Sequence, residues 1–466
     1  MNTWKINLVL FCLLLTRAAF VVGQVGQVGQ QRPTSGVIVI QGATLINGTG
    51  SPSIRNGAIV VDGGRIRDIG PRNEVRVPGN AQIVDARGKW VIPGLIDAHV
   101  HFSQSGGIYT RPDIVDLRKW RSYEKEMEWI KQRLPYTFER YLVSGVTGVV
   151  DCGGPMWNFE MRDIASHTKK APRVAVAGPL IATYLPPTTL ASDPDIVKPD
   201  SPAQARDLVR RQLERKPDLI KLWWVRRQGD NFNEQVQIMS AAIDESKSHS
   251  VRVAVHATEL DTAKAAVRAG ADILVHSVSD RLVDTEFINL VKNRDVLYIT
   301  TLAVEEGYRM VLDRQVALTD IEQKLGDPEV IATWSELAKI PAAEIPGGVP
   351  HIPAPPKRPA AYDNLMPLES AEVRVVAGTD AGNTGTLHGP SLHHEMELMA
   401  AAGLRPMDII VSATKNAAAV MGLQNDAGTL QKGKFADLVI LDADPLADIK
   451  NTRKIFKVMK GGEFVP

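Results

Sequence analysis

Short apolar runs alternate with longer amphipathic stretches through the middle of the chain. Eight runs have the composition and length of buried strands, and they cover residues 94–99, 146–151, 173–177, 219–223, 252–256, 273–276, 296–301 and 374–380. Stretches typical of helices lie between them, among them residues 202–216, 234–247, 261–269 and 284–292. Because strands that alternate with helices form parallel sheets, the pattern predicts an α/β fold, a (β/α)8 TIM-like barrel over residues 94–427.

Both ends of the chain have a different pattern. Short β-prone runs separated by turn signals such as Asn56-Gly57 fill residues 36–93, and similar runs recur in residues 428–466. We therefore expect a small β-sandwich domain that is built from both chain ends.

One segment interrupts the alternation before the last predicted barrel strand. Residues 324–369 are rich in Pro and Ala and show no strand–helix rhythm. Long irregular segments inside a compact domain often carry function. We interpret this one as an insertion over the barrel mouth, in the position of a lid.

The first residues predict export. Lys5 precedes an apolar run over residues 6–15, which is shorter than the roughly 20 residues that cross a bilayer, and small residues follow it. This is typical of a signal peptide over residues 1–23, with an uncleaved membrane anchor as the alternative. Residues 24–35, which include repeats of VGQ, predict a low-complexity spacer. We expect a secreted or periplasmic protein without a stable membrane span.

The charge balance restricts the classes of binding partner that the sequence supports. Lys and Arg number 54 against 53 Asp and Glu, for a formal net charge of +1, which gives no argument for nucleic-acid binding. Of the two cysteines, Cys12 falls in the signal peptide, so a processed chain would keep Cys152 alone and form no internal disulfide. We expect a small-molecule substrate, and the pattern points to no particular oligomeric state.

Candidate chemistry begins in the first predicted barrel strand. The run VIPGLIDAHVHF ends with His99 and His101 two positions apart. Side chains at positions i and i+2 of a strand point to the same face, so two imidazoles side by side form half of a metal site.

Further candidate ligands follow at the ends of later strands. Lys221, His256, His276 and Asp380 lie at the fourth, fifth, sixth and eighth predicted strands. Imidazole and carboxylate groups bind divalent metals. A buried lysine beside metal ions loses its proton more easily and can react with carbon dioxide, which would give a metal-bridging carbamate.

The chain resembles the amidohydrolase superfamily, in its prolidase-like and imidazolonepropionase-like branch. The motifs that carry the resemblance occur in the family's order, and they are PGLIDAHVHF, SGVTGVVDCGG, DLIKLW, His256, His276, GTDAG and ATKNAAAVMGL with GKFADLVIL. The resemblance implies that His99, His101 and Asp380 hold one divalent metal ion, that His256 and His276 hold a second, and that carbamylated Lys221 bridges the two together with a hydroxide.

The implied reaction is the hydrolysis of an amide or other C–N bond by a metal-activated hydroxide. Asp380 would be the catalytic residue, because a carboxylate beside the attacking water can accept its proton and pass it to the leaving nitrogen. The expected substrate is a small-molecule amide or a dipeptide. Zinc is the first choice for a histidine-rich site, and manganese, iron or cobalt would also fit.

Two alternatives remain open at this point. Where the branch commonly has His-Ala-His-Gly, this chain has His256-Ala257-Thr258-Glu259, so the motif also fits a mononuclear deaminase or cyclic-amide hydrolase that uses Glu259. The other alternative is a catalytically silent binding protein on a barrel scaffold. Tyr109, Tyr184 and His388 are weaker candidates for substrate contacts in predicted loops.

Overall fold

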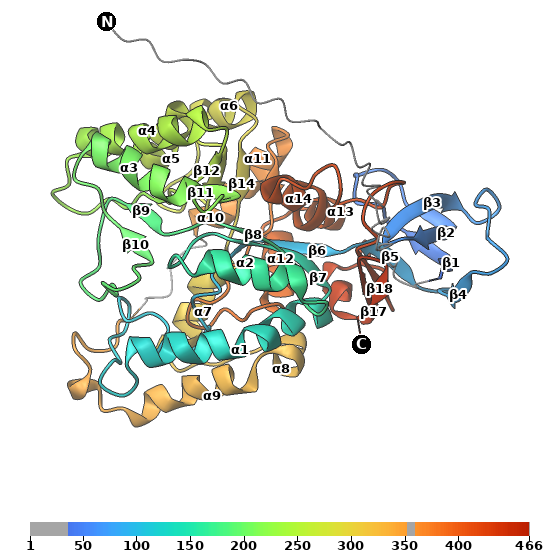
Figure 1. The fold of residues 1–466 in the computed structure, drawn as a ribbon, viewed down its shortest axis with the longest axis horizontal. Coiled ribbons are helices and arrows are strands. Elements are labelled where there is room, and N and C mark those ends of the chain that lie inside the picture. The colour runs from blue at the N-terminus through green and yellow to red at the C-terminus, as the bar shows by residue number, and fades with distance from the viewer. Residues whose placement is uncertain (1–35, 352–358, 466) are drawn as a thin grey trace, which may run out of the picture. The chain divides into compact units, whose positions relative to one another are not determined.

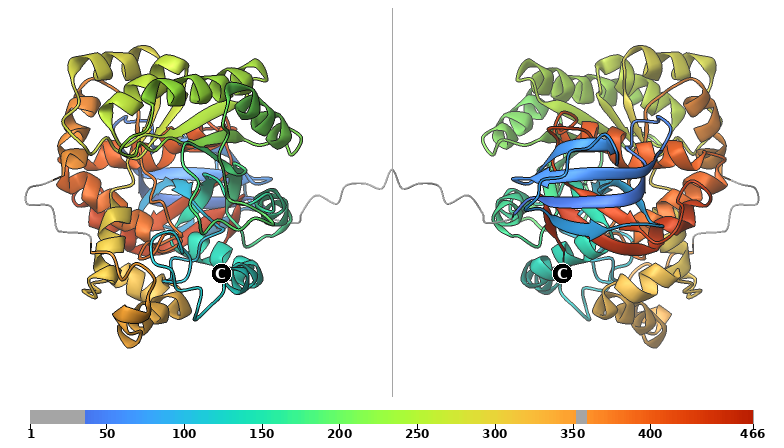
Figure 2. Two further views of the ribbon diagram at one scale, coloured as in Figure 1. Left: turned by 90° about the vertical axis from the view of Figure 1, so that its left-hand side faces the viewer. Right: turned by 90° about the vertical axis from the view of Figure 1, so that its right-hand side faces the viewer.

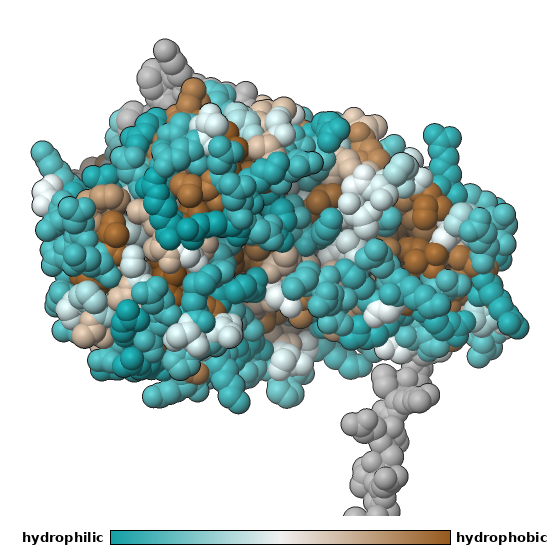
Figure 3. All heavy atoms as spheres, turned by 90° about the horizontal axis from the view of Figure 1, so that it is seen from above, coloured by the Kyte–Doolittle hydropathy of each residue, from teal (hydrophilic) through white to brown (hydrophobic). Residues whose placement is uncertain are grey.

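The computed structural model describes residues 36–351 and 359–465 (Figure 1). The predicted signal peptide (1–23) and spacer (24–35) lie outside the described residues and stay predictions. Within the described residues, no helix combines the length and the apolar character needed to cross a membrane. On the face shown in Figure 3, hydrophobic residues appear in separate patches among hydrophilic ones.

Strands from both ends of the chain share one sheet, as the neighbouring blue and red strands in Figure 2 show. Its order is β18-β17-β16-β5-β1-β2-β3, and β4 pairs with β1. Because β16 lies between β5 and β17, the C-terminal segment completes the interior of the sheet. The strands are β1 (Ile38–Leu45), β2 (Ile54–Asp62), β3 (Arg65–Pro71), β4 (Gln82–Asp85), β5 (Trp90–Pro93), β16 (Leu438–Leu441), β17 (Ile455–Lys460) and β18 (Glu463–Phe464).

The middle of the chain forms two parallel sheets, of seven and three strands, in the orders β10-β9-β11-β12-β13-β14-β15 and β6-β7-β8. Backbone hydrogen bonds link both edges of the three-stranded sheet to the larger one, from Ala98 N to Ala377 O (3.1 Å) and from Asp218 N, directly before β11, to Val176 O (3.0 Å). The strands are β6 (Leu95–Val100), β7 (Val146–Asp151), β8 (Arg173–Val176), β9 (Leu180–Ala182), β10 (Ile196–Val197), β11 (Leu219–Trp223), β12 (Arg252–His256), β13 (Ile273–Val275), β14 (Leu297–Ile299) and β15 (Val375–Val376). The predicted α/β class is confirmed.

Helices separate the parallel strands, and several begin at the capping residues that their sequences provide. Ser201 and Asn231, for example, accept a hydrogen bond from a backbone N–H of the first turn of α3 and α4. The helices between and after the strands are α1 (Tyr123–Val143), α2 (Asn158–His167), α3 (Pro202–Leu213), α4 (Phe232–Ser248), α5 (Leu260–Ala269), α6 (Thr285–Asn293), α7 (Ala303–Leu312), α12 (Ser391–Ala401), α13 (Pro406–Val411), η3 (Ser412–Asn416), α14 (Ala417–Met421) and η4 (Ile449–Arg453).

The predicted insertion is largely helical where the structure describes it. The Trp334 indole N–H donates to Gly106 O (2.9 Å), which fixes this segment against the loop that follows β6. Its position as a lid stays a prediction. The segment and the turn before it contain α8 (Asp320–Leu325), α9 (Pro328–Glu336), η1 (Leu337–Lys339), η2 (Ala342–Glu344), α10 (Ala360–Asp363) and α11 (Leu365–Ser370).

Several strands end earlier than the sequence predicted, and two of them precede predicted ligand residues. β13 stops at Val275 and β15 at Val376, whereas the predicted strands ran to His276 and Asp380. Both of these residues have a left-handed backbone, with φ of 71° and 62°. A left-handed residue cannot continue a pleated strand, so the β13 ladder ends before His276. Asp380 lies beyond the end of β15, so its left-handed backbone sets the direction of its own side chain and not the end of that strand.

Candidate metal centre

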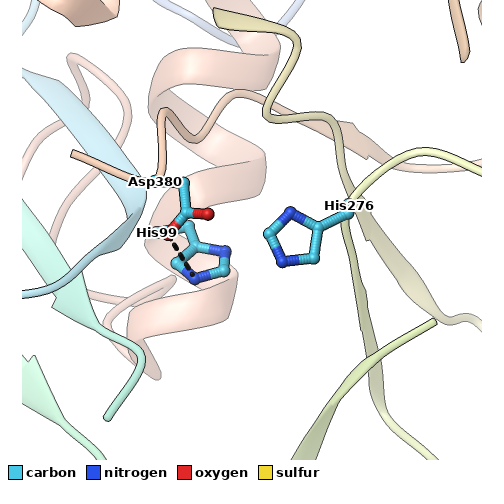
Figure 4. Close-up of side chains that lie close together, drawn as sticks. All are labelled: His99, His276 and Asp380. Atoms are coloured by element: carbon cyan, nitrogen blue, oxygen red, sulfur yellow. Dashed lines mark ion pairs between the residues drawn. The ribbon is translucent and has the colours of Figure 1, made fainter. Parts of the chain in front are cut away.

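The structure brings all six predicted ligand residues together near the C-terminal ends of the parallel strands. His99 lies in β6 and His101 directly follows it, Lys221 lies in β11, His256 ends β12, His276 follows β13, and Asp380 follows β15. Figure 4 shows His99, His276 and Asp380 converging, and one ligand atom from each lies within 4.8 Å of the others. The His256 ring lies beside that of His276, with 4.4 Å between centroids.

The closest contacts join His99, His101 and Asp380. Asp380 Oδ1 lies 3.3 Å from His99 Nε2 and 3.1 Å from His101 Nε2. The two Nε2 atoms are themselves 3.1 Å apart. His101 Nδ1 lies 2.7 Å from the Gly153 carbonyl, which can only accept a hydrogen bond, so Nδ1 carries the proton and Nε2 presents a lone pair.

The protonation states are those that metal ligands require. Burial, together with the nearby charge of Lys221, holds the pKa of His99 well below its usual value. Burial also lowers the pKa of His276 to about 3. Burial acts to raise the pKa of Asp380, but His99 and His101 outweigh it and hold that pKa well below its usual value. The imidazoles of His99 and His276 are therefore neutral, and the Asp380 carboxylate is ionised, at neutral pH.

This donor set fits a divalent cation. His99 Nδ1 and Asp380 Oδ1 are buried and have no hydrogen-bond partner among the described residues. Lone pairs on His101 Nε2 and Asp380 Oδ1 face each other at 3.1 Å, an arrangement that is repulsive without a proton or a cation between them. A cation between the two atoms removes this repulsion, so the donor set fits a divalent metal ion.

Lys221 is the unusual member of the cluster. Its side chain is among the largest fully buried ones, and Nζ lies 3.4 Å from His99 Nε2. Burial lowers the pKa of the amine, because the charged form loses its hydration. A deprotonated amine is the form that reacts with carbon dioxide.

Neighbouring groups orient the ligands. The Thr301 hydroxyl lies 2.6 Å from His276 Nδ1. The buried Asp97 carboxylate accepts from His99 N (3.3 Å) and from the hydroxyl of Thr379 (2.6 Å), which joins β6 to the segment that carries Asp380. Such contacts fix ring and backbone orientation at metal sites.

A cavity of about 340 Å³ opens onto these residues. A network of hydrogen-bonded polar side chains, which the sequence did not predict, lies at the wall of this cavity. Arg111 donates to the hydroxyl of Tyr308 (2.8 Å) and to Asn383 Oδ1, and Asn383 Nδ2 donates to Asp380 O (3.0 Å). The sequence indicated the region but not the residue. Arg111 lies in the loop after the first predicted barrel strand, where a site was expected, and nothing in the sequence distinguished it from the other residues of that loop.

The weaker candidates have other contacts. Glu259 Oε2 accepts a hydrogen bond from the Thr262 hydroxyl (2.9 Å) at the start of α5. The Tyr109 hydroxyl donates to Glu336 (2.7 Å), and His388 stacks on Phe102. These three side chains therefore have structural partners, and none of them lines the cavity.

Tyr184 also stays outside the cavity. Its ring lies against Trp223, with 6.2 Å between ring centroids, and Trp223 is the member of that pair that lines the cavity. Tyr184 can therefore influence the cavity through the position of that indole.

Comparison with known proteins agrees with this geometry. The sequence profile of the Amidohydrolase family matches residues 90–465. The chain is 24% identical to ochratoxinase from Aspergillus niger, over 92% of this chain and 86% of the relative, and 23% identical to enamidase from Eubacterium barkeri, over 86% and 84%. A solved Xaa-Pro dipeptidase with bound methionine superposes with a TM-score of 0.67 at 24% identity, covering 92% of this chain and 99% of that one, which shows a shared fold. The resemblance seen in the sequence is confirmed, and the chain belongs to the amidohydrolase family.

Proposed function

We propose that this protein is a metal-dependent amidohydrolase that cleaves an amide or other C–N bond of a small molecule or dipeptide. The observation that carries the proposal is the convergence of four imidazoles, a carboxylate and a buried lysine at one end of the parallel strands. The relatives named ochratoxinase, enamidase and Xaa-Pro dipeptidase support this substrate class.

The proposed architecture is a closed (β/α)8 barrel over residues 94–427, with a β-sandwich domain from residues 36–93 and 428–466. The backbone hydrogen bonds that link both edges of the three-stranded sheet to the seven-stranded one support closure. A barrel of this kind has its chemistry at the C-terminal ends of its strands, where the ligand residues lie. We also propose that residues 1–23 direct export to the periplasm or the outside of the cell.

His99, His101 and Asp380 would hold one divalent metal ion, His256 and His276 a second, and carbamylated Lys221 would bridge them. Zinc is the proposed metal because imidazole donors dominate the set. When bound, such ions lower the pKa of water towards neutrality and polarise a substrate carbonyl.

Proton transfer and the orientation of the ligands are then the roles of the chain's own groups. The Asp380 carboxylate is ionised and lies at the cavity wall, so it accepts the proton of the attacking water and delivers it to the leaving nitrogen. Asn383 holds the backbone of Asp380 through its carbonyl. The Gly153 carbonyl holds the His101 ring in the tautomer whose Nε2 faces the centre.

The test is a metal count per chain on protein purified with bicarbonate, for the wild type and for Lys221→Ala. We expect two metal ions in the wild type, one or none in the variant, and hydrolysis of members of an amide and dipeptide panel by the wild type alone. One metal ion that is unaffected by the substitution would contradict the bridged centre. It would favour the mononuclear alternative.

A further inference from the structure

One end of the active-site cavity carries three charged side chains, Arg111, Asp113 and Asp195. Two of them neutralise each other. Arg111 Nε and one terminal nitrogen donate to the two oxygens of Asp113, at 2.8 and 2.7 Å, and the other terminal nitrogen donates to Tyr308 and Asn383. This bidentate pair leaves no net charge for a ligand.

Asp195 has no such partner. Among the residues that the structure describes, the only hydrogen bond to its carboxylate comes from its own backbone N–H, and no cationic side chain forms an ion pair with it. Burial and the neighbouring Asp113 raise the pKa of Asp195, as expected for a partly dehydrated negative charge beside another. The other acidic side chain of the cavity outside the ligand cluster, Glu305, is exposed, so water screens its charge.

The position of Asp195 is fixed by the sheet. It directly precedes β10, whose Ile196 pairs with Leu180 of β9, and Asp195 O accepts a hydrogen bond from Leu180 N (2.8 Å). A side chain on a rigid element keeps its place without ligand, which is what a binding group needs. Leu180, Ile196 and Ile114 add apolar surface to the same cavity.

We propose that Asp195 binds the ammonium group of the substrate, so that the preferred substrates are amides with a free amino group near an apolar side chain, such as amino-acid amides and dipeptides. The inference rests on the proposed function and specifies its substrate class. An unpaired, partly buried carboxylate is stabilised by a cation that donates hydrogen bonds to it, and an ammonium group is the cation that an amide substrate can carry.

The test compares two substrates that differ only in charge, L-leucine p-nitroanilide and its N-acetyl derivative. In Asp195→Asn we expect kcat/KM for the free amine to fall about 10–100-fold, mainly through KM, and kcat/KM for the acetylated compound to stay unchanged. Equal losses on both substrates, or no loss on either, would overturn the proposal.

Asp193→Asn is the matched control. Asp193 lies two residues away and accepts a hydrogen bond from Met156 N (3.0 Å), and it does not line the cavity. We expect it to leave the preference for the free amine intact. Melting temperatures of both variants, expected to equal the wild type within a few degrees, show that the fold persists.

A binding measurement separates this inference from the proposed function. If the metal-loaded wild type cleaves neither substrate, the proposed activity on such amides fails, and titration calorimetry with n-butylammonium and n-butanol tests Asp195 alone. Binding of the ammonium compound that is lost in Asp195→Asn supports the subsite. Equal binding of both compounds, or no binding of either, refutes it.

Discussion

At the scale of single residues, Asp380 combines two tasks in the proposed site. Its Oδ1 lies close to both His99 and His101, and its carboxylate stays ionised because these imidazoles hold its pKa low. Asp380→Asn keeps the shape and one oxygen donor but removes the proton acceptor. We expect most of the metal to remain and kcat to fall roughly 10²–10⁴-fold. Metal analysis and steady-state kinetics on the same sample check this, and near-full activity would exclude the mechanism.

Glu259 separates the proposed enzyme from the mononuclear deaminase. Its carboxylate accepts a hydrogen bond from Thr262 at the first turn of α5 and does not line the cavity. We therefore expect Glu259→Gln to retain kcat within about threefold and to lower the free energy of unfolding by about 1 kcal/mol at most, since Gln keeps an oxygen that can accept the partly buried hydrogen bond from Thr262. A hundredfold loss of kcat at unchanged melting temperature would instead give Glu259 a role in proton transfer.

At the scale of elements, the junction between β14 and α7 depends on one buried carboxylate. Glu395 of α12 is fully buried and accepts hydrogen bonds from the Thr300 hydroxyl, Leu302 N (3.0 Å) and Ala303 N (2.7 Å). The same junction carries Thr301, the partner of His276. In Glu395→Gln, one of the two accepting carboxylate oxygens is replaced by an NH2 group, which cannot accept a hydrogen bond from these donors. We expect a loss of about 1–3 kcal/mol in the free energy of unfolding and weaker metal binding.

A second variant on α12 serves as the control, because it tests whether a loss of metal binding follows from destabilisation alone. Glu397 pairs with Arg453 and contacts no group of the metal centre. Glu397→Gln should also lower the free energy of unfolding, but metal affinity, measured by competition with a chelator, should stay as in the wild type. If both variants lose metal equally, the effect of Glu395 is general destabilisation and not positioning.

The same elements show how far the sequence could predict the site. The apolar runs located β7, β11 and β12 with their observed bounds, because buried parallel strands have a strong local signal. The left-handed turns at His276 and Asp380 were not predictable, since Asp and His adopt this backbone more often than most residues, but nothing local in the sequence marks the positions at which they do so. Loop contacts such as that between Arg111 and Asn383 join residues far apart in the sequence and leave no local pattern.

At the scale of the whole molecule, an ion pair between a buried aspartate and a partly buried arginine links the sheet made from both chain ends to the parallel strands. Asp437, directly before β16, accepts from Arg173 of β8 at 2.7 and 3.2 Å and from Gly461 N at 2.6 Å. Arg173 also lies over the Phe435 ring, at 3.7 Å from its centroid. These contacts hold strands from the C-terminal segment against β8 of the parallel strands.

Asp437→Ala leaves the partly buried Arg173 without its counter-charge and the N–H of Gly461 without an acceptor. Because such losses cost about 1–3 kcal/mol each, we expect the free energy of unfolding to fall by about 2–4 kcal/mol in chemical denaturation. Asp85→Ala breaks the exposed pair with Arg87, which water screens, so this variant should unfold at nearly the same denaturant concentration as the wild type. If the two variants unfold at the same denaturant concentration, the Asp437 pair does not hold the two parts together, and the attachment relies on apolar packing alone.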